Sequence, residues 1–197
     1  MKLTLLTTAL FCMAGQIFAQ KHEVGLTIGR LLENDRTLVR SQGGTALQAN
    51  YGYRFWNNSS VAISGEFHML ASPLREVAGA LSATRDYSSL YLTPGVRVKL
   101  NPKGRIQPYG AVGGGYALYE QSTRTIGGQP NPAPRHIHRG ALMFGAGVDV
   151  PVMRWLALRG EVRDFYTGNP VYFGINNPSG GQHNVVAGGG FVIRFGE

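Results

Sequence analysis

Large apolar residues recur at every second position in eight separate segments of this 197-residue sequence. In the clearest of them, Tyr51, Tyr53 and Phe55 alternate with Gly52 and Arg54. A period of two predicts strands with one face in an apolar medium and the other face in polar surroundings. The eight segments are Glu23–Leu31, Thr45–Trp56, Ser60–Leu70, Tyr87–Leu100, Arg105–Tyr119, Arg139–Val150, Trp155–Tyr166 and Asn184–Phe195.

The connections between these segments alternate between long and short. The short ones are Asn57–Ser59, Asn101–Gly104 and Pro151–Arg154. The long ones are Leu32–Gly44, Ala71–Asp86, Glu120–His138 and Thr167–His183. This order is typical of barrels in the bacterial outer membrane, which have short periplasmic turns and long outer loops. Because a sheet in lipid cannot leave its edges unpaired, the pattern predicts an all-β fold, an eight-stranded antiparallel up-and-down transmembrane β-barrel.

Composition excludes several other classes of protein. The chain has 28 Gly, is 43% hydrophobic and only 15% charged, unlike an ordinary charged cytosolic enzyme. After the first twenty residues, no apolar run reaches the roughly 18 residues of a membrane-spanning helix. The net charge of +8 is spread singly along the chain without Lys/Arg runs, so we expect no nucleic-acid binding.

The N-terminus has the features of a secretory signal. Met1-Lys2 is a short positive region, Leu3–Ala14 is apolar, and Ala19 is a small residue before a cleavage point. We therefore predict a signal peptide at residues 1–19 and an outer-membrane barrel domain at residues 20–197. The single cysteine, Cys12, falls within the signal and lacks the small preceding residues of a lipoprotein site, so the mature domain is expected to be stable without disulfides.

Charged residues occupy the face that the alternation assigns to the barrel interior. An eight-stranded barrel has room inside only for its own side chains. We expect these charges to form an ion-pair network that fills the lumen, a structural role more than a catalytic one. The predicted network comprises Arg54, Glu66, Arg97, Lys99, Asp149, Arg159, Glu161, Arg163 and Arg194.

Aromatic residues lie near the predicted strand ends, where the two membrane interfaces would be. They are Tyr53, Phe55, Trp56, Trp155, Phe191 and Phe195. Such positions favour aromatic girdles at the headgroup level. The alternative is a soluble, lipocalin-like barrel, because alternation alone does not say which face meets lipid.

Three stretches carry a resemblance to known barrels: Tyr91–Arg97, Pro108–Tyr116 and Gly189–Phe195. With them, the chain resembles the small outer-membrane β-barrel family, the OmpA-transmembrane, OmpX and OmpW group of opacity-type porin-family proteins. The resemblance implies location in the outer membrane and an assembly signal at Gly190, Ile193 and Phe195 that the outer-membrane assembly machinery reads. Here Gly196 and Glu197 follow the aromatic residue on which such chains often end.

Two groups of residues raise the possibility of chemistry. Ser64, Glu66 and His68 share one face and are the residue types of a hydrolase triad, although residues two apart on a strand lie about 6.6–6.8 Å apart. This keeps a lipid A hydrolase or acyltransferase as an alternative. His136 and His138 are half of a possible metal site, without a third ligand nearby in sequence. We therefore expect no catalytic residues, metal or other cofactor.

Arginines in or beside the long connections predict a cationic outer rim. They are Arg36, Arg40, Arg75, Arg85, Arg124, Arg135 and Arg139. Such a rim would attract phosphates of lipopolysaccharide or another anionic polymer. Our hypothesis is a monomeric, non-enzymatic integral outer-membrane protein that contributes to envelope integrity or to adhesion through its outer loops. A narrow channel for small solutes is a further alternative.

Overall fold

The computed structural model describes residues 21–32, 39–41, 44–79, 84–121, 125–126, 129–130, 134–168 and 181–196. The predicted signal peptide lies outside these residues. The chain forms eight long strands: β1 (His22–Leu32), β3 (Thr45–Asn57), β4 (Val61–Gly79), β5 (Thr84–Leu100), β6 (Gln107–Gln121), β9 (His136–Pro151), β10 (Leu156–Gly168) and β11 (Gly181–Phe195). Three short strands accompany them: β2 (Val39–Ser41), β7 (Thr125–Ile126) and β8 (Gln129–Pro130).

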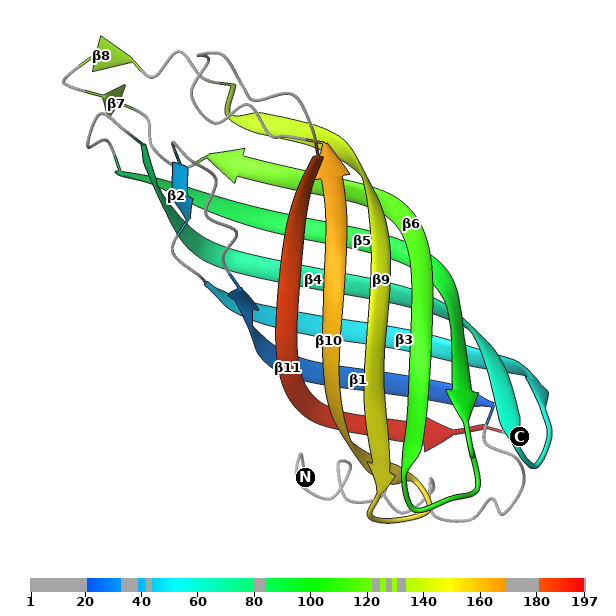
Figure 1. Ribbon diagram of the computed structural model, residues 1–197. Helices are drawn as coiled ribbons and strands as arrows, with labels where there is room; N and C mark the ends of the chain where they lie inside the picture. Colours follow the sequence, from blue (N-terminus) through cyan, green and yellow to red (C-terminus); the bar gives the residue numbers. More distant parts are fainter. Residues whose placement is uncertain are drawn as a thin grey trace, which may run out of the picture.

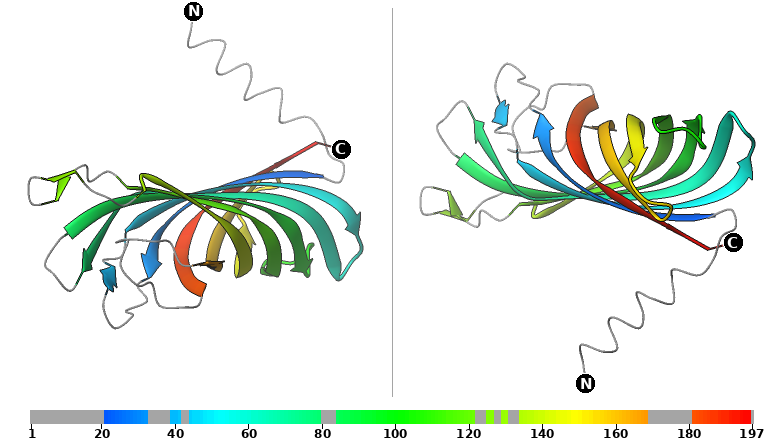
Figure 2. Two further views of the ribbon diagram at one scale, coloured as in Figure 1. Left: turned by 90° about the horizontal axis from the view of Figure 1, so that it is seen from above. Right: turned by 90° about the horizontal axis from the view of Figure 1, so that it is seen from below.

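The eight long strands close into one antiparallel barrel. Each pairs with the next long strand along the chain, and the ring closes where β1 pairs with β11 over eleven residue pairs, from His22–Phe195 to Leu32–Val185. Figure 1 shows the strands winding obliquely around the barrel, and Figure 2 shows them from two opposite sides. The predicted fold class is thereby confirmed. Among the described residues, no helix is long and apolar enough to span a membrane.

The connections at the two ends differ, as predicted. The turns after β3, β5 and β9 lie together at the lower end in Figure 1, where β11 also ends. Asn58 closes the first turn, because its side-chain oxygen accepts hydrogen bonds from the backbone of Ser60 (2.8 Å) and Val61 (2.7 Å). In the second turn Asn101 adopts a left-handed conformation with φ of 49°, which asparagine tolerates better than most residues.

The second long connection is shorter than predicted. Residues 71–86 were expected to form a loop, but β4 continues to Gly79 and β5 begins at Thr84. The register shifts between Ser72 and Arg75, around Pro73, so the simple alternation is lost there although the strands remain paired. A bulge of this kind accommodates an extra residue and a proline without ending the ladder.

Burial is inverted relative to a soluble protein. The outward faces carry large apolar side chains that are about half exposed, such as Ile28 (60%), Phe67 (46%) and Phe144 (52%). The inward faces bury charged residues instead, including Arg163 (0%) and Asp149 (0%). Because this arrangement is stable only with an apolar medium outside, the structure is that of a membrane barrel.

Exposed aromatic side chains lie at the end with the short turns. Tyr53, Phe55, Trp56 and Trp155 are between 42% and 58% exposed there. His22 joins them, stacking on Phe195 with ring centroids 5.6 Å apart and hydrogen-bonding the hydroxyl of Tyr51 at 2.7 Å. Amphipathic rings of this kind favour the headgroup level of a bilayer.

Candidate functional site

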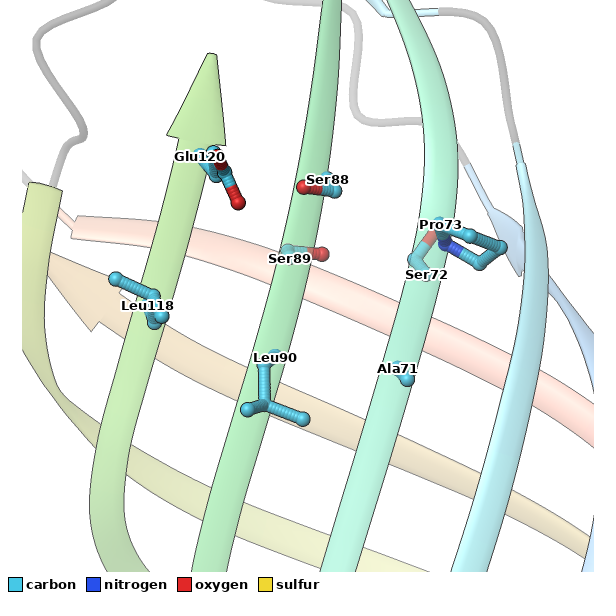
Figure 3. Close-up of a pocket in the computed structure, with 8 residues that line it drawn as sticks. All are labelled: Ala71, Ser72, Pro73, Ser88, Ser89, Leu90, Leu118 and Glu120. Carbon is cyan, nitrogen blue, oxygen red and sulfur yellow. The ribbon is translucent and has the colours of Figure 1, made fainter. Parts of the chain in front are cut away.

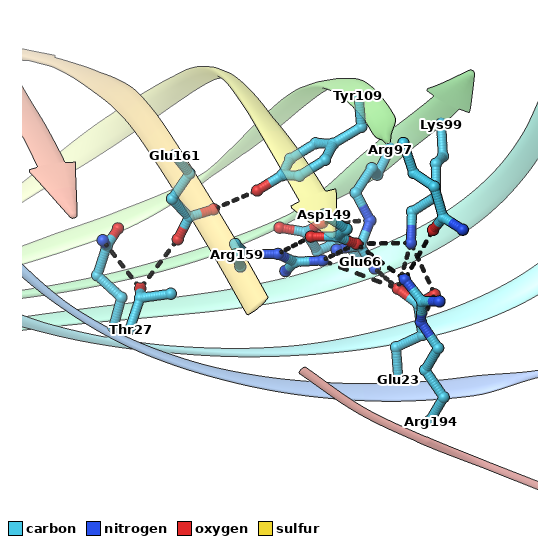
Figure 4. Close-up of polar contacts among 12 residues, drawn as sticks. Glu23, Thr27, Glu66, Arg97, Lys99, Tyr109, Asp149, Arg159, Glu161 and Arg194 are labelled. Atoms are coloured by element: carbon cyan, nitrogen blue, oxygen red, sulfur yellow. Dashed lines mark hydrogen bonds and ion pairs between the residues drawn. The ribbon is translucent and has the colours of Figure 1, made fainter. Parts of the chain in front are cut away.

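Glu23 is the centre of a buried ionic network in the half of the barrel nearer the short turns (Figure 4). It points inward from β1, and its side chain is 2% exposed. Cations from four other strands surround its carboxylate: Arg97 at 2.8 Å, Lys99 at 2.8 Å, Arg54 at 3.0 Å, Arg194 at 3.4 Å and Arg159 at 3.9 Å. One carboxylate therefore connects β1 to β3, β5, β10 and β11.

Asp149 on β9 forms a second acidic centre beside Glu23. Arg159 donates two hydrogen bonds to it, from Nε at 2.7 Å and from Nη2 at 2.9 Å. Lys99 and Arg194 contact the same carboxylate at 2.8 and 3.3 Å. Since Lys99, Arg159 and Arg194 each contact both carboxylates, the two centres form one cluster.

The network continues toward the middle of the barrel through Glu66 and Glu161. Arg163 reaches both of them, Glu66 at 2.6 Å and Glu161 at 2.9 Å. Glu161 also accepts hydrogen bonds from the hydroxyls of Tyr109 at 2.7 Å and Thr27 at 3.0 Å. The Tyr109 ring in turn lies 4.8 Å from the guanidinium of Arg159, within cation–π range.

The structure places all nine sequence-predicted lumen residues inside the barrel and joins each of them to the network by at least one ion pair. The alternation missed Glu23 and Tyr109. Glu23 stands at the start of its segment, but it has the same odd numbering as Thr27, and so lies on the face opposite to the apolar Val24, Leu26 and Ile28. Tyr109 lies on a glycine-rich segment where no large inward residue marked the face.

A second, apolar layer fills the half of the interior nearer the long connections, which the sequence analysis did not predict. Tyr91, Phe165 and Tyr119 form its centre, with ring centroids 5.0 Å apart for Tyr91–Phe165 and 5.8 Å apart for Tyr91–Tyr119. The remaining members are Leu31, Ala46, Leu70, Ala111, Ala117, Ile137, Ala141, Met143 and Val186. No member is more than 9% exposed, and buried polar side chains lie at the same level, among them Ser89, Gln121, Thr167 and Asn184. The interior is therefore filled by an ionic layer and a mainly apolar layer in series.

Ser64 and Glu66 lie within the ionic layer, Ser64 directly opposite Arg54 and Arg97, and His68 lies at the boundary with the apolar layer; none of the three is at a surface. Their exposed fractions are 6%, 4% and 0%. Both carboxylate oxygens of Glu66 are engaged by Arg97 and Arg163, at 3.2 and 2.6 Å, and His68 stacks against Phe165. A lipid on the outside of the barrel has no route to these side chains, so the geometry does not favour the hydrolase hypothesis.

His136 and His138 point outward from β9 on either side of buried Ile137. Each has a partner of its own: His136 lies 3.5 Å from Glu120, and His138 hydrogen-bonds the hydroxyl of Tyr116. Within the part of the chain that the structure describes, no three His, Cys, Asp or Glu residues are grouped to hold a metal ion.

A shallow hollow of about 230 Å³ lies where β4, β5 and β6 run side by side near the long connections (Figure 3). Ala71, Pro73, Leu90 and Leu118 supply apolar walls, and Glu120 lies at its polar end. Its volume is below the roughly 300–1,000 Å³ of ordinary small-molecule sites. It adjoins the register shift in β4, which accounts for the irregular surface.

Comparisons with known proteins agree with this architecture. The family model for the outer membrane protein beta-barrel domain matches residues 3–191. No curated protein matches the chain. Among solved structures, the outer membrane protein OprG from Pseudomonas aeruginosa superposes with a TM-score of 0.58 at 14% identity, over 89% of this chain and 96% of that one. Neisserial surface protein A (NspA) superposes with a TM-score of 0.54 at 12% identity, over 89% and 97%.

Both structural likenesses lie far below the identity at which activities carry over, so they show the fold alone. The family match covers most of the sequence, and the observed closure, inverted burial and exposed aromatic residues at the short-turn end agree with an outer-membrane barrel. The chain belongs to the outer membrane protein beta-barrel family and is an integral protein of the outer membrane.

Proposed function

We propose that this protein is a non-enzymatic structural and surface-interaction protein, a sealed barrel that holds its long outer connections at the cell surface. The observation that supports this most directly is the doubly closed interior. Six cations and four carboxylates fill one half, and the buried apolar cluster, together with buried polar side chains beside it, fills the other. A solute would have to break both layers to pass, which argues against the alternative of a narrow channel.

A sealed, rigid barrel leaves the outer connections as the place for recognition. In this proposal the long connections face outward and contact lipopolysaccharide or another anionic surface polymer through their arginines. Of these, Arg135 is exposed and pairs with Glu120 at 3.2 Å, and Arg139 is partly buried. Arg36 and Arg124 lie outside the described residues, and the side chains of Arg40, Arg75 and Arg85 are likewise not described.

The sealed interior is tested by recording ion currents across planar bilayers that contain the refolded protein. We expect no conductance steps. Reproducible, ion-selective steps would contradict the proposal and restore the channel alternative. Lipid A mass spectra from cells with and without the expressed protein test the enzyme alternative, and the proposal requires them to be identical.

Surface recognition is tested with the protein in nanodiscs and lipopolysaccharide vesicles. Replacing Arg36, Arg124 and Arg135 together by Gln should weaken binding and reduce its salt dependence. The matched control is Arg154→Gln, which removes an exposed cation from the short-turn end. If wild type, the triple variant and Arg154→Gln bind the vesicles equally, the loop arginines have no part in the binding and leave the proposal.

A further inference from the structure

The outward face of β1 and β3 is a column of directly opposed side chains that changes character along its length. From the short-turn end, the pairs are His22–Tyr53, Val24–Tyr51, Leu26–Ala49, Ile28–Leu47 and Arg30–Thr45. The middle of the column is apolar, with Leu26, Ile28 and Leu47 exposed by 47%, 60% and 50%. The guanidinium of Arg30 and the hydroxyl of Thr45 therefore interrupt this lipid-facing apolar surface near its end, where Leu32, 46% exposed, is the last outward residue of β1.

Arg30 must point outward, because its neighbour Leu31 is 1% exposed inside the barrel and adjacent strand residues face opposite ways. Arg30 is exposed, and it forms no ion pair with any of the residues that the structure describes. A charge on the lipid face costs about 2–4 kcal/mol at the bilayer midplane and about 0–1 kcal/mol near the interfaces. The depth of Arg30 therefore decides whether it is tolerated.

Arg30 stands eight residues beyond His22 on β1. At about 3.3 Å per residue and a strand tilt of about 40°, this places it about 20 Å above the His22–Tyr53 pair. Because the apolar band of such barrels is about 25 Å tall and long cationic side chains extend toward the interface, the guanidinium reaches the headgroup level of the opposite leaflet.

Two other charged or polar side chains on the outward face at this end have protein partners. His183 contacts Asp164 at 2.6 Å, and Arg135 contacts Glu120 at 3.2 Å. Arg30 differs, since a hydroxyl and apolar side chains are what the column places around it. Among the described residues no carboxylate pairs with Arg30, so its position on the lipid face favours an anionic group of the membrane as its partner.

We propose that Arg30 and Thr45 form a binding site for a phosphate of lipid A in the outer leaflet. Directly opposed residues of antiparallel strands have Cβ atoms about 4.5–5.5 Å apart, so the guanidinium and the hydroxyl can reach one phosphate together. Arginine is suited to this role because its planar fork donates two parallel hydrogen bonds to phosphate. An acyl chain of the same lipid lies against Ile28 and Leu47. The site deepens the proposed function, on whose orientation of the barrel it rests.

The test is a titration of the detergent-solubilised protein with diphosphoryl lipid A, with bound lipid counted by native mass spectrometry. Arg30→Gln should weaken binding about tenfold, as expected for the loss of hydrogen bonds to a charged group, and Thr45→Val about threefold. Arg30→Lys retains the charge but not the fork, and should lie between wild type and Arg30→Gln. The matched control is Arg154→Gln at the short-turn end, which should bind like wild type.

Several outcomes would overturn the site: unchanged binding by Arg30→Gln, an equal loss in Arg154→Gln, or equal affinity for lipid A stripped of its phosphates. Displacement of the lipid by inorganic phosphate as readily as by free lipid A would instead assign the residues to free phosphate. If Arg30→Gln does not fold, as judged by the heat-sensitive gel band, the site is tested with Thr45→Val and Arg30→Lys. Unchanged lipid A binding by both of these variants would then overturn the site. The conductance and loop-arginine experiments involve neither Arg30 nor Thr45, so failure of this site is distinguishable from failure of the proposed function.

Discussion

Replacing Glu23 by Gln removes the carboxylate that five cations share while leaving the shape of the side chain almost unchanged. The six cations of the network face four carboxylates, so it already carries an excess of two positive charges. The substitution raises that excess to three inside a closed barrel. Arg54 then has no carboxylate partner within the described network, and Lys99, Arg159 and Arg194 keep only Asp149.

Removing one partner of a buried ion pair costs about 3–5 kcal/mol, because the remaining charge stays buried without compensation. The Gln carbonyl still accepts one hydrogen bond, so we expect the lower end, a loss of about 3 kcal/mol in the free energy of unfolding. A second substitution, Lys99→Met, removes one of the surplus cations. In the double variant part of the loss should be recovered, which would reveal the coupling between the two positions.

The assay is equilibrium unfolding in urea with the protein in lipid vesicles, followed by the fluorescence of Trp56 and Trp155 and by the heat-dependent gel shift. The matched control is Glu120→Gln, since Glu120 pairs with Arg135 and His136 but its side chain is 40% exposed. Exposed pairs contribute about 0–1 kcal/mol, so this variant should unfold nearly as wild type does. The reasoning is refuted if Glu23→Gln unfolds within about 0.5 kcal/mol of wild type, the range of ordinary surface substitutions.

Three further substitutions test other parts of the fold. A Cβ at Gly190 would lie 2.0 Å from the Leu26 carbonyl oxygen, so Gly190→Ala should prevent the closure of β1 on β11. The variant should therefore lose the heat-shifted band after refolding without assembly factors. The control is Gly160→Ala, where a Cβ meets nothing within 4 Å, and this variant should refold normally. Phe165→Ala should lower the free energy of unfolding by about 3–5 kcal/mol by opening a cavity in the apolar layer, whereas truncating lipid-facing Phe144 should cost less. Asn101→Val places a β-branched residue at a φ of 49° and should lower the free energy of unfolding in urea by about 1–3 kcal/mol. Asn101→Gly should be tolerated. Equal stabilities of the two variants would exclude backbone strain at this turn.

The strand pattern was predictable because the membrane requires apolar side chains on the outer face of every strand, and this requirement appears in the sequence as an apolar residue at every second position. Successive residues of a strand face opposite ways, so Arg97 and Lys99 face inward where Val96 and Val98 face outward. Odd or even numbering alone assigns these four residues to their faces. The rule failed at Pro73, where the register shift in β4 breaks the parity and the strand seemed to end. Periodicity records which face a residue occupies, but it does not record that two strands remain paired across a bulge.

The division of the interior into two layers was not predictable by the same means. Leu70 and Met143 have the inward parity of Glu66 and Asp149 on their strands, so the alternation treats them as members of the same face. What separates them is height along the barrel axis, which depends on strand tilt and on the stagger between strands. Glu23 shows the same limit: its five partners come from strands up to 171 positions away, and only closure brings them together.

The position of Glu23 at the first strand gives the network a second role besides filling space. The charged side chains that meet this carboxylate come from β3, β5, β10 and β11, so its contacts form only when both neighbours of β1 and two more distant strands have the correct register. A slip of one residue in β10 would turn Arg159, Glu161 and Arg163 toward the lipid, at about 2–4 kcal/mol for each arginine near the bilayer midplane. The apolar layer cannot discriminate in this way, because an apolar side chain such as Val186 is acceptable on either face. We infer that the ionic half of the lumen selects the register of the closed barrel, and that the apolar half adds stability once that register is formed.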